Sequence, residues 1–407
     1  MRLSLLRFLK CPACSGRLTF MSMEAPGLEH KGKYVILDNH SANQETIQFS
    51  RYLVEMKVNA EFSYPGEEDE FRQGLLACGD CGRWYPLENY IPELLPDHLR
   101  DWRRDLVWLQ DHETRIGSDL RQRLQSCSEA FMNDLSDIQD TGSHYKNSEI
   151  HIDKKVDGAD FFGPGYYSPF YFYDVDFTLH QLRRFANVAP LLELQKGHVV
   201  LDMGVGYAWT TEWLMKIGVE PIGIDICRTY MDVGIKRMGA KRPHLVVGDV
   251  EFLPIRDQAV DAVLCYDAFH HVPDRKKAMA CFFAALKPMG KVVLAEPNGR
   301  HEHAEISKQV MKKYGILEKG MELEDIRNYC EDLGPTEAEQ HFILKVTSHE
   351  LGATVTQDFI ESLNFVDESL YRVWKGKPVH AKTAGKVPVG RGKRWVKRML
   401  SRLGAGR

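Results

Sequence analysis

The chain has 407 residues, with 43% hydrophobic and 27% charged residues and a formal net charge of −4. This length exceeds one ordinary domain, so we expect two or three folded units. The composition argues against a membrane-spanning protein, because no stretch approaches the roughly 18 consecutive apolar residues that a transmembrane helix needs.

Residues 1–10 superficially have the pattern of a signal peptide. However, Arg7 interrupts their short apolar stretch and no small-residue cleavage site follows. We therefore expect a cytoplasmic protein, soluble or peripheral to a membrane. In the reducing cytoplasm, paired cysteines more often bind a metal ion than form disulfides.

Two C-x-x-C pairs, Cys11-Pro-Ala-Cys14 and Cys78-Gly-Asp-Cys81, are the first motifs of the chain. Thiolates at this spacing can share one cation, and two such turns can complete a closed tetrahedral zinc site. A closed site leaves no position for catalysis, so the zinc would be structural. The alternative is that one or both pairs are turn cysteines without a metal ion.

With their flanking residues, the two pairs resemble the small zinc-ribbon module that serves as an activating subunit of RNA and protein methyltransferases. The resemblance implies a β-rich zinc-ribbon domain over residues 1–96. The two pairs are farther apart than in that compact module, so residues 25–70 would be an insertion.

From residue 97 the apolar spacing becomes helical, with Leu99, Trp102 and Leu106 on one stripe. We expect a helical connector there, followed from residue 141 to residue 160 by an exposed polar linker or a mobile lid. Residues 161–173 are unusually aromatic, and their glycines and prolines favour a loop. Such a loop could cover a cofactor, and packing is the plainer alternative.

A glycine turn between a short apolar strand and a helix start follows, at Asp202-x-Gly204-x-Gly206. Glycine at both positions permits positive φ and lets a ligand lie against bare backbone at the helix N-terminus. A dinucleotide fingerprint would need a third glycine where Trp209 stands, which disfavours NAD and FAD. Asp202 could hold an ammonium group, and Asp225 ends the next strand at the spacing typical of a ribose-binding carboxylate.

With the segments that follow it, this turn resembles the class I S-adenosylmethionine-dependent methyltransferases. The resemblance runs in order from about residue 191 to residue 297, and Ala208 replaces a third glycine often seen there. It implies a doubly wound, Rossmann-like α/β fold with a mostly parallel sheet, and S-adenosylmethionine as the cofactor. The residues expected at the cofactor are Asp202, Gly204, Gly206, Asp225, Ile226, Asp249, Val250 and Asp267.

His270 and His271 follow the fourth expected strand, at the sheet edge where ligands of open parallel sheets gather. Methyl transfer needs help with the acceptor's proton, which a histidine can give near neutral pH. We expect His270 to be the catalytic base and His271 to be a packed histidine. Glu296, at the end of the fifth strand, could bind the acceptor or form a salt bridge. His301-Glu-His303 is expected to be a solvated loop.

Glu368 is the last acidic residue, and twelve Lys or Arg residues follow it, which leaves a charge of −16 on the preceding chain. Residues 371–407 therefore form a basic tail, in which Trp395 and Leu403 lie on one amphipathic helical stripe. This helix could lie on an anionic membrane, bind RNA phosphates or dock on the acidic body.

The sequence predicts a methyltransferase domain over residues 161–370 that acts on a small molecule or a membrane-associated envelope metabolite, such as a lipid-linked acceptor. Through its tail the protein could be peripheral at the inner membrane face. One alternative is an RNA methyltransferase acting on ribosomal or transfer RNA, and another is a non-catalytic S-adenosylmethionine-binding module. The fourth strand ends in Tyr266-Asp-Ala-Phe instead of an Asn-Pro-Pro-Tyr-like motif, which favours an acceptor other than RNA.

Overall fold

The structure is a computed structural model. It describes residues 1–24, 35–38, 54–55, 70–133, 142–155, 168–169, 175–239, 242–334, 336–342 and 368–375. All of them belong to one compact unit that ends at Lys375. The expected helix in the basic tail, most of the aromatic segment and most of the insertion at residues 25–70 lie outside the described residues.

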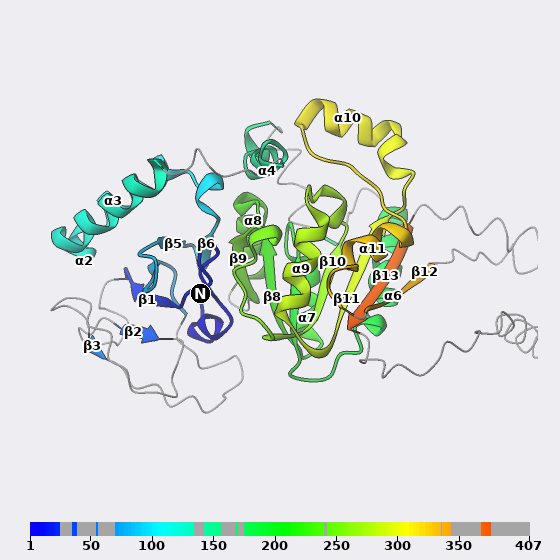
Figure 1. Cartoon of the computed structure of the whole chain (residues 1–407), viewed down its shortest axis with the longest axis horizontal. Coiled ribbons are helices and arrows are strands. Elements are labelled where there is room, and N and C mark those ends of the chain that lie inside the picture. Colours follow the sequence, from blue (N-terminus) through cyan, green and yellow to red (C-terminus); the bar gives the residue numbers. More distant parts are fainter. Residues whose placement is uncertain are drawn as a thin grey trace, which may run out of the picture. The chain divides into compact units, whose positions relative to one another are not determined.

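A twisted sheet forms the centre of the C-terminal two thirds of this unit (Figure 1). Its strands occur in the order β12-β13-β11-β10-β7-β8-β9, and β7 to β11 run parallel. β13 pairs antiparallel with β11 and with β12, so the last two strands extend the sheet at this edge. The bounds are β7 Val199–Met203, β8 Glu220–Asp225, β9 His244–Gly248, β10 Val260–Tyr266, β11 Leu286–Pro297, β12 Thr336–Phe342 and β13 Glu368–Lys375.

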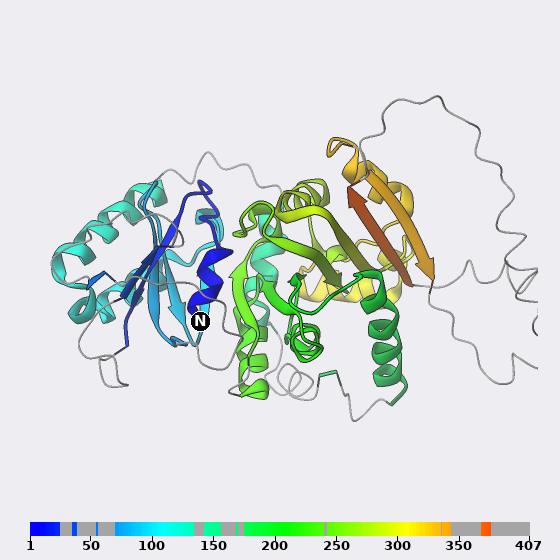
Figure 2. The same ribbon diagram turned by 90° about the horizontal axis from the view of Figure 1, so that it is seen from below.

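Helices cover both faces of this sheet, because its strands are apolar on both sides. One face packs against α9 (Arg275–Ala285) and α11 (Leu323–Cys330). The opposite face packs against α6 (Val175–Leu191) and α7 (Trp209–Lys216). The same arrangement is visible from below in Figure 2. The structure confirms the predicted doubly wound, mostly parallel α/β fold.

The N-terminal ribbon continues the central sheet, with antiparallel pairing from β6 to β2 and parallel pairing of β2 with β3. Its strands follow in the order β6-β5-β4-β1-β2-β3, and β6 pairs in parallel with β9. All thirteen described strands therefore form one sheet. The bounds are β1 Leu18–Ser22, β2 Val35–Asp38, β3 Val54–Glu55, β4 Gly74–Cys78, β5 Trp84–Glu88 and β6 Ile91–Leu94.

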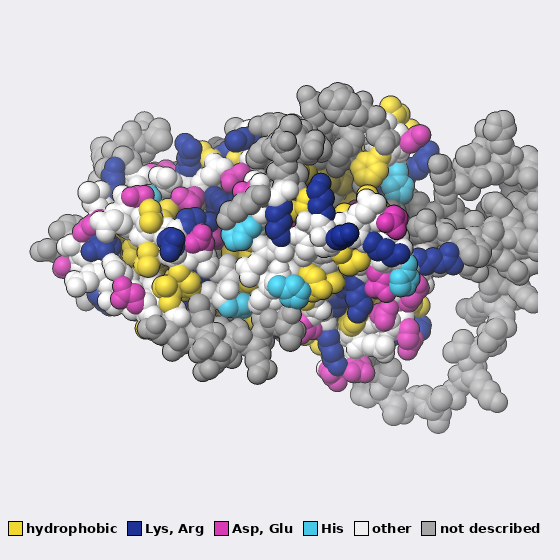
Figure 3. Space-filling model, turned by 90° about the horizontal axis from the view of Figure 1, so that it is seen from above, with side chains coloured by type: hydrophobic (Ala, Val, Ile, Leu, Met, Phe, Trp, Pro, Cys, Tyr) yellow, Lys and Arg dark blue, Asp and Glu magenta, His cyan; other side chains and the backbone are white. Residues whose placement is uncertain are grey.

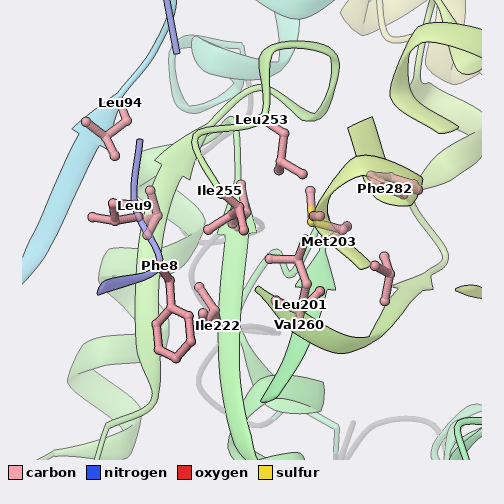
Figure 4. Close-up of a cluster of buried hydrophobic side chains, with 14 of the residues drawn as sticks. Phe8, Leu9, Leu94, Leu201, Met203, Ile222, Leu253, Ile255, Val260 and Phe282 are labelled. Atoms are coloured by element: carbon pink, nitrogen blue, oxygen red, sulfur yellow. The ribbon is translucent and has the colours of Figure 1, made fainter. Parts of the chain in front are cut away.

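Side chains reinforce the junction between the ribbon and the core. Leu9, fully buried just after the 3-10 helix η1 (Leu3–Arg7), forms a bridge with Ile255, and Arg7 donates two hydrogen bonds to Glu220 at 2.7 and 2.6 Å. Figure 4 shows Leu9 and Leu94 in one hydrophobic cluster with Ile255 and other core residues. Ribbon and core share a hydrophobic interior, so the ribbon is an integral part of the unit.

Helices occupy the segment predicted as a helical connector. They are α1 (Trp102–Asp111), α2 (Glu113–Ile116) and α3 (Ser118–Asn133). Trp108 and Leu124 on these helices pack in one cluster with Trp84 of the ribbon, and the Trp84 indole N–H donates to Ser128 Oγ at 2.8 Å. These helices therefore complete the ribbon's core and do not serve only as a spacer.

The polar segment after them differs from the expected linker. It contains helix α4 (Ser143–Ile150) and the 3-10 turn η4 (Ile152–Lys154). Lys146 of α4 is 4% exposed, and Ile152 is also buried. The prediction of an exposed linker was wrong here, because pairing with distant side chains buries polar residues that have no apolar periodicity.

Two further helices are α8 (Arg228–Met238) and α10 (Glu305–Tyr314). Among the described residues, no helix is long and apolar enough to cross a membrane.

Candidate active site

The glycine turn after β7 forms a bare backbone cradle at the carboxyl edge of the sheet. Gly204 has φ +67°, and a Cβ there would collide with the side chain of Ala268. Gly206 has φ +49°, and a Cβ there would have no described heavy atom within 4 Å beyond its chain neighbours. Gly204 is therefore required by packing, whereas Gly206 leaves open space in front of the backbone. Ala208 also adopts a left-handed conformation, with φ +58°.

Asp202 lies at the bottom of this cradle and is 1% exposed. Its Oδ2 accepts hydrogen bonds from the hydroxyls of Thr210 at 2.8 Å and Thr211 at 2.6 Å. Among the described residues no donor reaches Oδ1. Burial raises the pKa of Asp202 to about 6. An unpaired buried carboxylate oxygen is costly, so this atom suits a cationic ligand group such as an ammonium.

Asp225 ends β8 and ties the next strand to the glycine turn. Its two oxygens accept hydrogen bonds from the backbone N–H groups of Gly206 and Cys227, both at 2.7 Å. Burial raises its pKa to about 6. Carboxylate oxygens have further lone pairs, so Asp225 can still accept from a diol. Ile226 follows it and packs on the hydrophobic cluster that includes Met231 and Leu245.

Asp249 follows β9, and its Oδ1 accepts a hydrogen bond from the Glu251 backbone N–H at 2.9 Å, which caps η5 (Val250–Phe252). Its Oδ2 accepts from the Lys146 ammonium at 2.8 Å. Val250, the first residue of η5, packs against the main core cluster. Lys146 was not among the predicted site residues, because a single lysine in a polar segment carries no local signal of burial.

Asp267 follows β10 with φ +57° and is the most exposed of the expected cofactor residues, with 46% of its side chain accessible. Burial opposes its charge, but the Arg184 guanidinium, 3.4 Å away, and the nearby histidines outweigh this and lower its pKa. The structure therefore brings all eight expected residues to the carboxyl ends of β7 to β10.

His270 lies beside the cradle on the 3-10 turn η6 (Phe269–His271) and is 4% exposed. Its Nδ1–H donates to Glu296 Oε2 at 2.7 Å. Glu296 is fully buried and also accepts the backbone N–H groups of Ala268 and Phe269 at 3.1 and 2.9 Å. Burial opposes the charged imidazole, but the bond to Glu296 and the nearby carboxylates outweigh it and raise the pKa of His270. A carboxylate thus orients the imidazole and leaves Nε2 for another partner.

The neighbouring histidines belong to a hydrogen-bonded network around Glu318. His301 Nε2 lies 2.5 Å from Glu318 Oε2, and His270 Nε2 lies 3.6 Å from the same oxygen. His271 Nδ1 donates to the Leu317 carbonyl at 2.6 Å, and burial lowers its pKa to about 4. His301 is therefore not part of a solvated loop as expected, because Glu318 binds it.

Among the described residues, three groups of side chains have the composition and spacing to bind a metal ion. His270 belongs to two such groups, one with His271 and Glu318 and one with Asp267 and Glu296. Both groups contain the short hydrogen bonds described above, so we interpret them as a polar network.

The third group contains the two C-x-x-C pairs, and all four sulfur atoms lie within 4.8 Å of one another. Cys11 Sγ lies 3.8 Å from Cys81 Sγ, and Cys14 Sγ lies 3.5 Å from Cys78 Sγ. Four thiolates about 2.3 Å from a tetrahedral zinc ion are separated by about 3.8 Å. The spacing of this group therefore fits a zinc ion.

Two family models match separate parts of the chain. Residues 201–294 match a methyltransferase domain, and residues 2–89 match the Trm112p-like proteins. The first segment contains the glycine turn and His270. The second contains both cysteine pairs.

Among curated proteins, methyltransferase GfsG of Streptomyces halstedii is 27% identical over 143 residues, which are 34% of this chain and 51% of the relative. Phosphoethanolamine N-methyltransferase 2 of Caenorhabditis elegans is 27% identical over 37% of this chain and 32% of the relative. Demethylmenaquinone methyltransferase of Renibacterium salmoninarum is 31% identical over 29% of this chain and 50% of the relative. The chain thus spans about half, or less, of these relatives' length.

Similar solved structures include a complex that contains the Haloferax volcanii Trm112 methyltransferase activator, with 18% identity, a TM-score of 0.39 and coverage of 48% of this chain and 90% of that chain. Phosphoethanolamine N-methyltransferase 2 of Haemonchus contortus has 18% identity, a TM-score of 0.37 and coverage of 48% and 53%. With the matched residues and the sheet topology together, the chain contains a methyltransferase domain of the class I fold preceded by a Trm112p-like domain.

Proposed function

We propose that the protein transfers the methyl group of S-adenosylmethionine to a small-molecule acceptor. The observation that carries the proposal is the buried His270–Glu296 pair, which lies beside a glycine cradle whose deepest carboxylate oxygen, on Asp202, has no donor among the described residues. The first feature suits proton transfer and the second suits a cationic amino-acid group. The match to a methyltransferase domain includes both Asp202 and His270.

Each cradle residue would contact the part of the cofactor that suits its chemistry. Asp202 would hold the ammonium group, Gly204 and Gly206 would let the cofactor approach the backbone, and Asp225 would accept from the ribose hydroxyls. Asp249 would accept from the exocyclic amino group of adenine, and Asp267 would complete the site at its open side. Ile226 and Val250 would pack against the ring. Bound S-adenosylmethionine supplies a methyl group on a positively charged sulfur, which is a reactive electrophile.

His270 would remove the proton that the acceptor loses as its oxygen or nitrogen gains the methyl group. The proton goes to Nε2, while Nδ1–H remains bonded to Glu296. Because a carboxylate lies on the far side of the ring, the resulting imidazolium is stabilised where it forms. His270 is therefore proposed as the catalytic base and Glu296 as its positioning residue.

The curated relatives favour a small acceptor. The names of two of them specify phosphoethanolamine and demethylmenaquinone, which are chemically different small molecules. The second is a quinone, so a membrane-associated acceptor is the finer part of the proposal. The basic tail would bring the protein to the anionic inner membrane face.

RNA is the second candidate acceptor, because the Trm112p-like match and the basic tail are compatible with it. Figure 3 shows several Lys and Arg side chains in a row across one half of the face in view, with Asp and Glu side chains beside them and on the other half. RNA phosphates bind to basic tracks of this kind. RNA is therefore kept as the second acceptor to test.

The four cysteines are proposed to bind one structural zinc ion, which would hold the ribbon turns together. Since β6 of the ribbon pairs with β9, the zinc would also support the strand next to Asp249. The Trm112p-like domain would thus stabilise the methyltransferase domain within the same chain.

Calorimetry with S-adenosylmethionine and S-adenosylhomocysteine tests the proposal at its base. We expect binding of both ligands and at least tenfold weaker binding in Asp225→Ala, since a ribose-binding carboxylate contributes about 1.5–3 kcal/mol. Transfer of a radioactive methyl group to phosphoethanolamine, demethylated quinones and RNA then compares the acceptors. His270→Asn should abolish transfer and His303→Asn should not, because the His303 side chain is 75% exposed and its Nε2 lies 3.7 Å from Glu302 Oε1, away from the network around Glu318. Absence of binding would refute the cofactor assignment.

A further inference from the structure

Helix α4 inserts one cation between two buried carboxylates at the end of β9. The Lys146 ammonium donates to Asp249 Oδ2 at 2.8 Å and to Glu251 Oε2 at 2.6 Å. The Lys146 side chain is 4% exposed and the two carboxylates are 2% exposed. Lys146 lies outside both segments that match family models, so neither match assigns it a role.

The two carboxylates accept the same kinds of hydrogen bond. Asp249 Oδ1 accepts the Glu251 backbone N–H at 2.9 Å, Glu251 Oε1 accepts the Asp274 backbone N–H at 2.9 Å, and the second oxygen of each accepts Lys146. Asp249 directly follows β9, which runs parallel to β8 and so ends at the same sheet edge as Asp225. Asp249 is therefore the member of the pair that the proposed function places against adenine.

Lys146 compensates the charge of this buried pair. Burial and the neighbouring Asp249 raise the pKa of Glu251, and Lys146 opposes that rise. Two buried carboxylates two residues apart repel each other, so without the cation between them they would not keep this arrangement. The hydrogen bond from Lys146 therefore fixes where the Asp249 oxygens lie.

The position of α4 places this cation over the nucleoside end of the cradle. Ile150, one turn after Lys146, packs on the same hydrophobic cluster as Ile226, which follows Asp225. Ile152 packs with Cys227, which follows Ile226 in the chain. The segment 142–155 thus contacts the ends of β8 and β9, where the proposed function puts the ribose and adenine.

We propose that Lys146 is a positioning residue for the cofactor's adenine, because its hydrogen bond fixes the Asp249 carboxylate as the acceptor for the exocyclic amino group. The inference rests on the proposed function, in which Asp249 meets adenine. It adds a residue from α4 to the cofactor site and gives that site its preference for adenine over a base with a carbonyl at the same position.

The test compares S-adenosylhomocysteine with S-inosylhomocysteine, in which an oxo group replaces the amino group. The wild type should bind S-adenosylhomocysteine at least tenfold more tightly, because an oxo group cannot donate to Asp249. In Lys146→Met we expect tenfold weaker binding of S-adenosylhomocysteine and a much smaller change for S-inosylhomocysteine. Asp249→Asn should reduce the same preference. In that background Lys146→Met should have little further effect, since both changes act through one carboxylate.

Lys155→Met is the matched control, because Lys155 lies on the same segment and donates to the Tyr314 carbonyl at 2.6 Å. It should leave both affinities unchanged. If Lys146→Met does not fold, Lys146→Gln, which keeps a donor without the charge, carries the same comparison.

Equal weakening of both ligands would mean that α4 merely supports the fold, and tighter binding of S-adenosylhomocysteine would mean that Lys146 competes with adenine. Either outcome would overturn the inference. Wild-type binding tests the proposed function separately: a wild type that binds neither ligand refutes the cofactor assignment, whereas a selective wild type with unchanged selectivity in Lys146→Met refutes only the role of Lys146.

Discussion

At the scale of residues, Gly204 and Gly206 have the same conformation for different reasons. Both have positive φ, but a side chain at position 204 meets Ala268, whereas one at position 206 meets open space. The first glycine is a requirement of folding and the second is a requirement of ligand approach. Substitution should separate the two roles.

We predict that Gly204→Ala destabilises the protein by about 2–4 kcal/mol, since it adds a steric collision to the roughly 1–2 kcal/mol cost of a left-handed non-glycine residue. Gly206→Ala should lower the free energy of unfolding by only about 1–2 kcal/mol, but it should weaken the binding of S-adenosylhomocysteine at least tenfold. Denaturant unfolding and calorimetry measure the two effects. Gly197→Ala, just before β7, is the control, because Gly197 has φ +81° and open space like Gly206. It should match the stability cost of Gly206→Ala and leave ligand affinity unchanged. Equal loss of stability in both variants would contradict the distinction.

The pH dependence of His270 gives a second prediction at this scale. Its pKa is raised above the ordinary 6.5, chiefly by Glu296 against the effect of burial. The stability that this pair contributes is fully present below about pH 6.5 and is lost as pH rises through the raised pKa. Methyl transfer should show the opposite trend and increase over that range, because a base must be neutral to accept a proton.

Histidine NMR titration of the wild type and Glu296→Gln measures this shift directly. The variant should show a lower pKa for His270, since it loses the carboxylate charge. His303→Asn should leave the titration of His270 unchanged. A pKa of His270 that is equal in the wild type and Glu296→Gln would show that the pair is not coupled.

The residues that sequence could identify are those with local motifs. Gly204, Gly206 and Asp225 lie at the ends of consecutive strands. The apolar pattern of those strands and the spacing between the motif residues are therefore enough to predict them. Lys146, Glu318 and Arg184 reach the same edge from segments that are distant in the chain. Their roles depend on tertiary placement, and nothing in their immediate sequence indicates it.

At the scale of elements, the ribbon and the core share strands and side chains, so each should depend on the other. Strand periodicity predicts β6 and β9 separately, but it contains no information on which strands pair. The helices α1 to α3 were likewise predictable as helices, whereas their packing on Trp84 was not. Local sequence determines element type, and the pairing of edges and apolar faces follows from the complete fold.

Leu9 tests the shared core. We predict that Leu9→Ala lowers the free energy of unfolding by about 2–5 kcal/mol, because a fully buried leucine leaves a cavity. Ribbon and core should still unfold in one transition. The control Ile217→Ala, at a position that is 57% exposed, should change the free energy of unfolding by less than about 0.5 kcal/mol. Two separate transitions for the wild type would argue against a common interior.

The cysteine cluster gives the next prediction. Cys78→Ser should reduce the zinc content from one ion per chain and lower the melting temperature, since losing one thiolate weakens a closed tetrahedral site. Elemental analysis and thermal unfolding measure both effects. Cys127→Ser is the matched control, because Cys127 lies outside the four-cysteine group. Full zinc content in Cys78→Ser would exclude the four-cysteine site.

At the scale of the whole molecule, charge is divided between the compact unit and the tail. The basic tail was predicted from residue 371, but β13 keeps residues up to Lys375 in the compact unit. Ten of the twelve basic residues follow Lys375. Truncation after Lys375 should therefore leave cofactor affinity unchanged. It should abolish sedimentation with anionic vesicles, because each basic residue near such a surface contributes about 1 kcal/mol.

Salt separates the possible partners of the tail. Binding to RNA through phosphate contacts should collapse as salt rises, whereas binding to anionic vesicles should keep an apolar part from Trp395 and Leu403. Neutral vesicles are the control and should not bind. Tight retention of RNA without vesicle binding would favour an RNA acceptor.

The parallel pairing of β6 with β9 also sets an order of events during synthesis. Glu93 and Val247 are partners, so about 150 residues must be translated after β6 before its neighbour exists. At roughly 5–20 residues per second this takes on the order of 10–30 s. Throughout that interval the nascent ribbon presents an unpaired strand edge, which is a template for wrong pairing. Ribosomes that stall before residue 248 would release chains prone to aggregate, whatever the final stability of the finished protein.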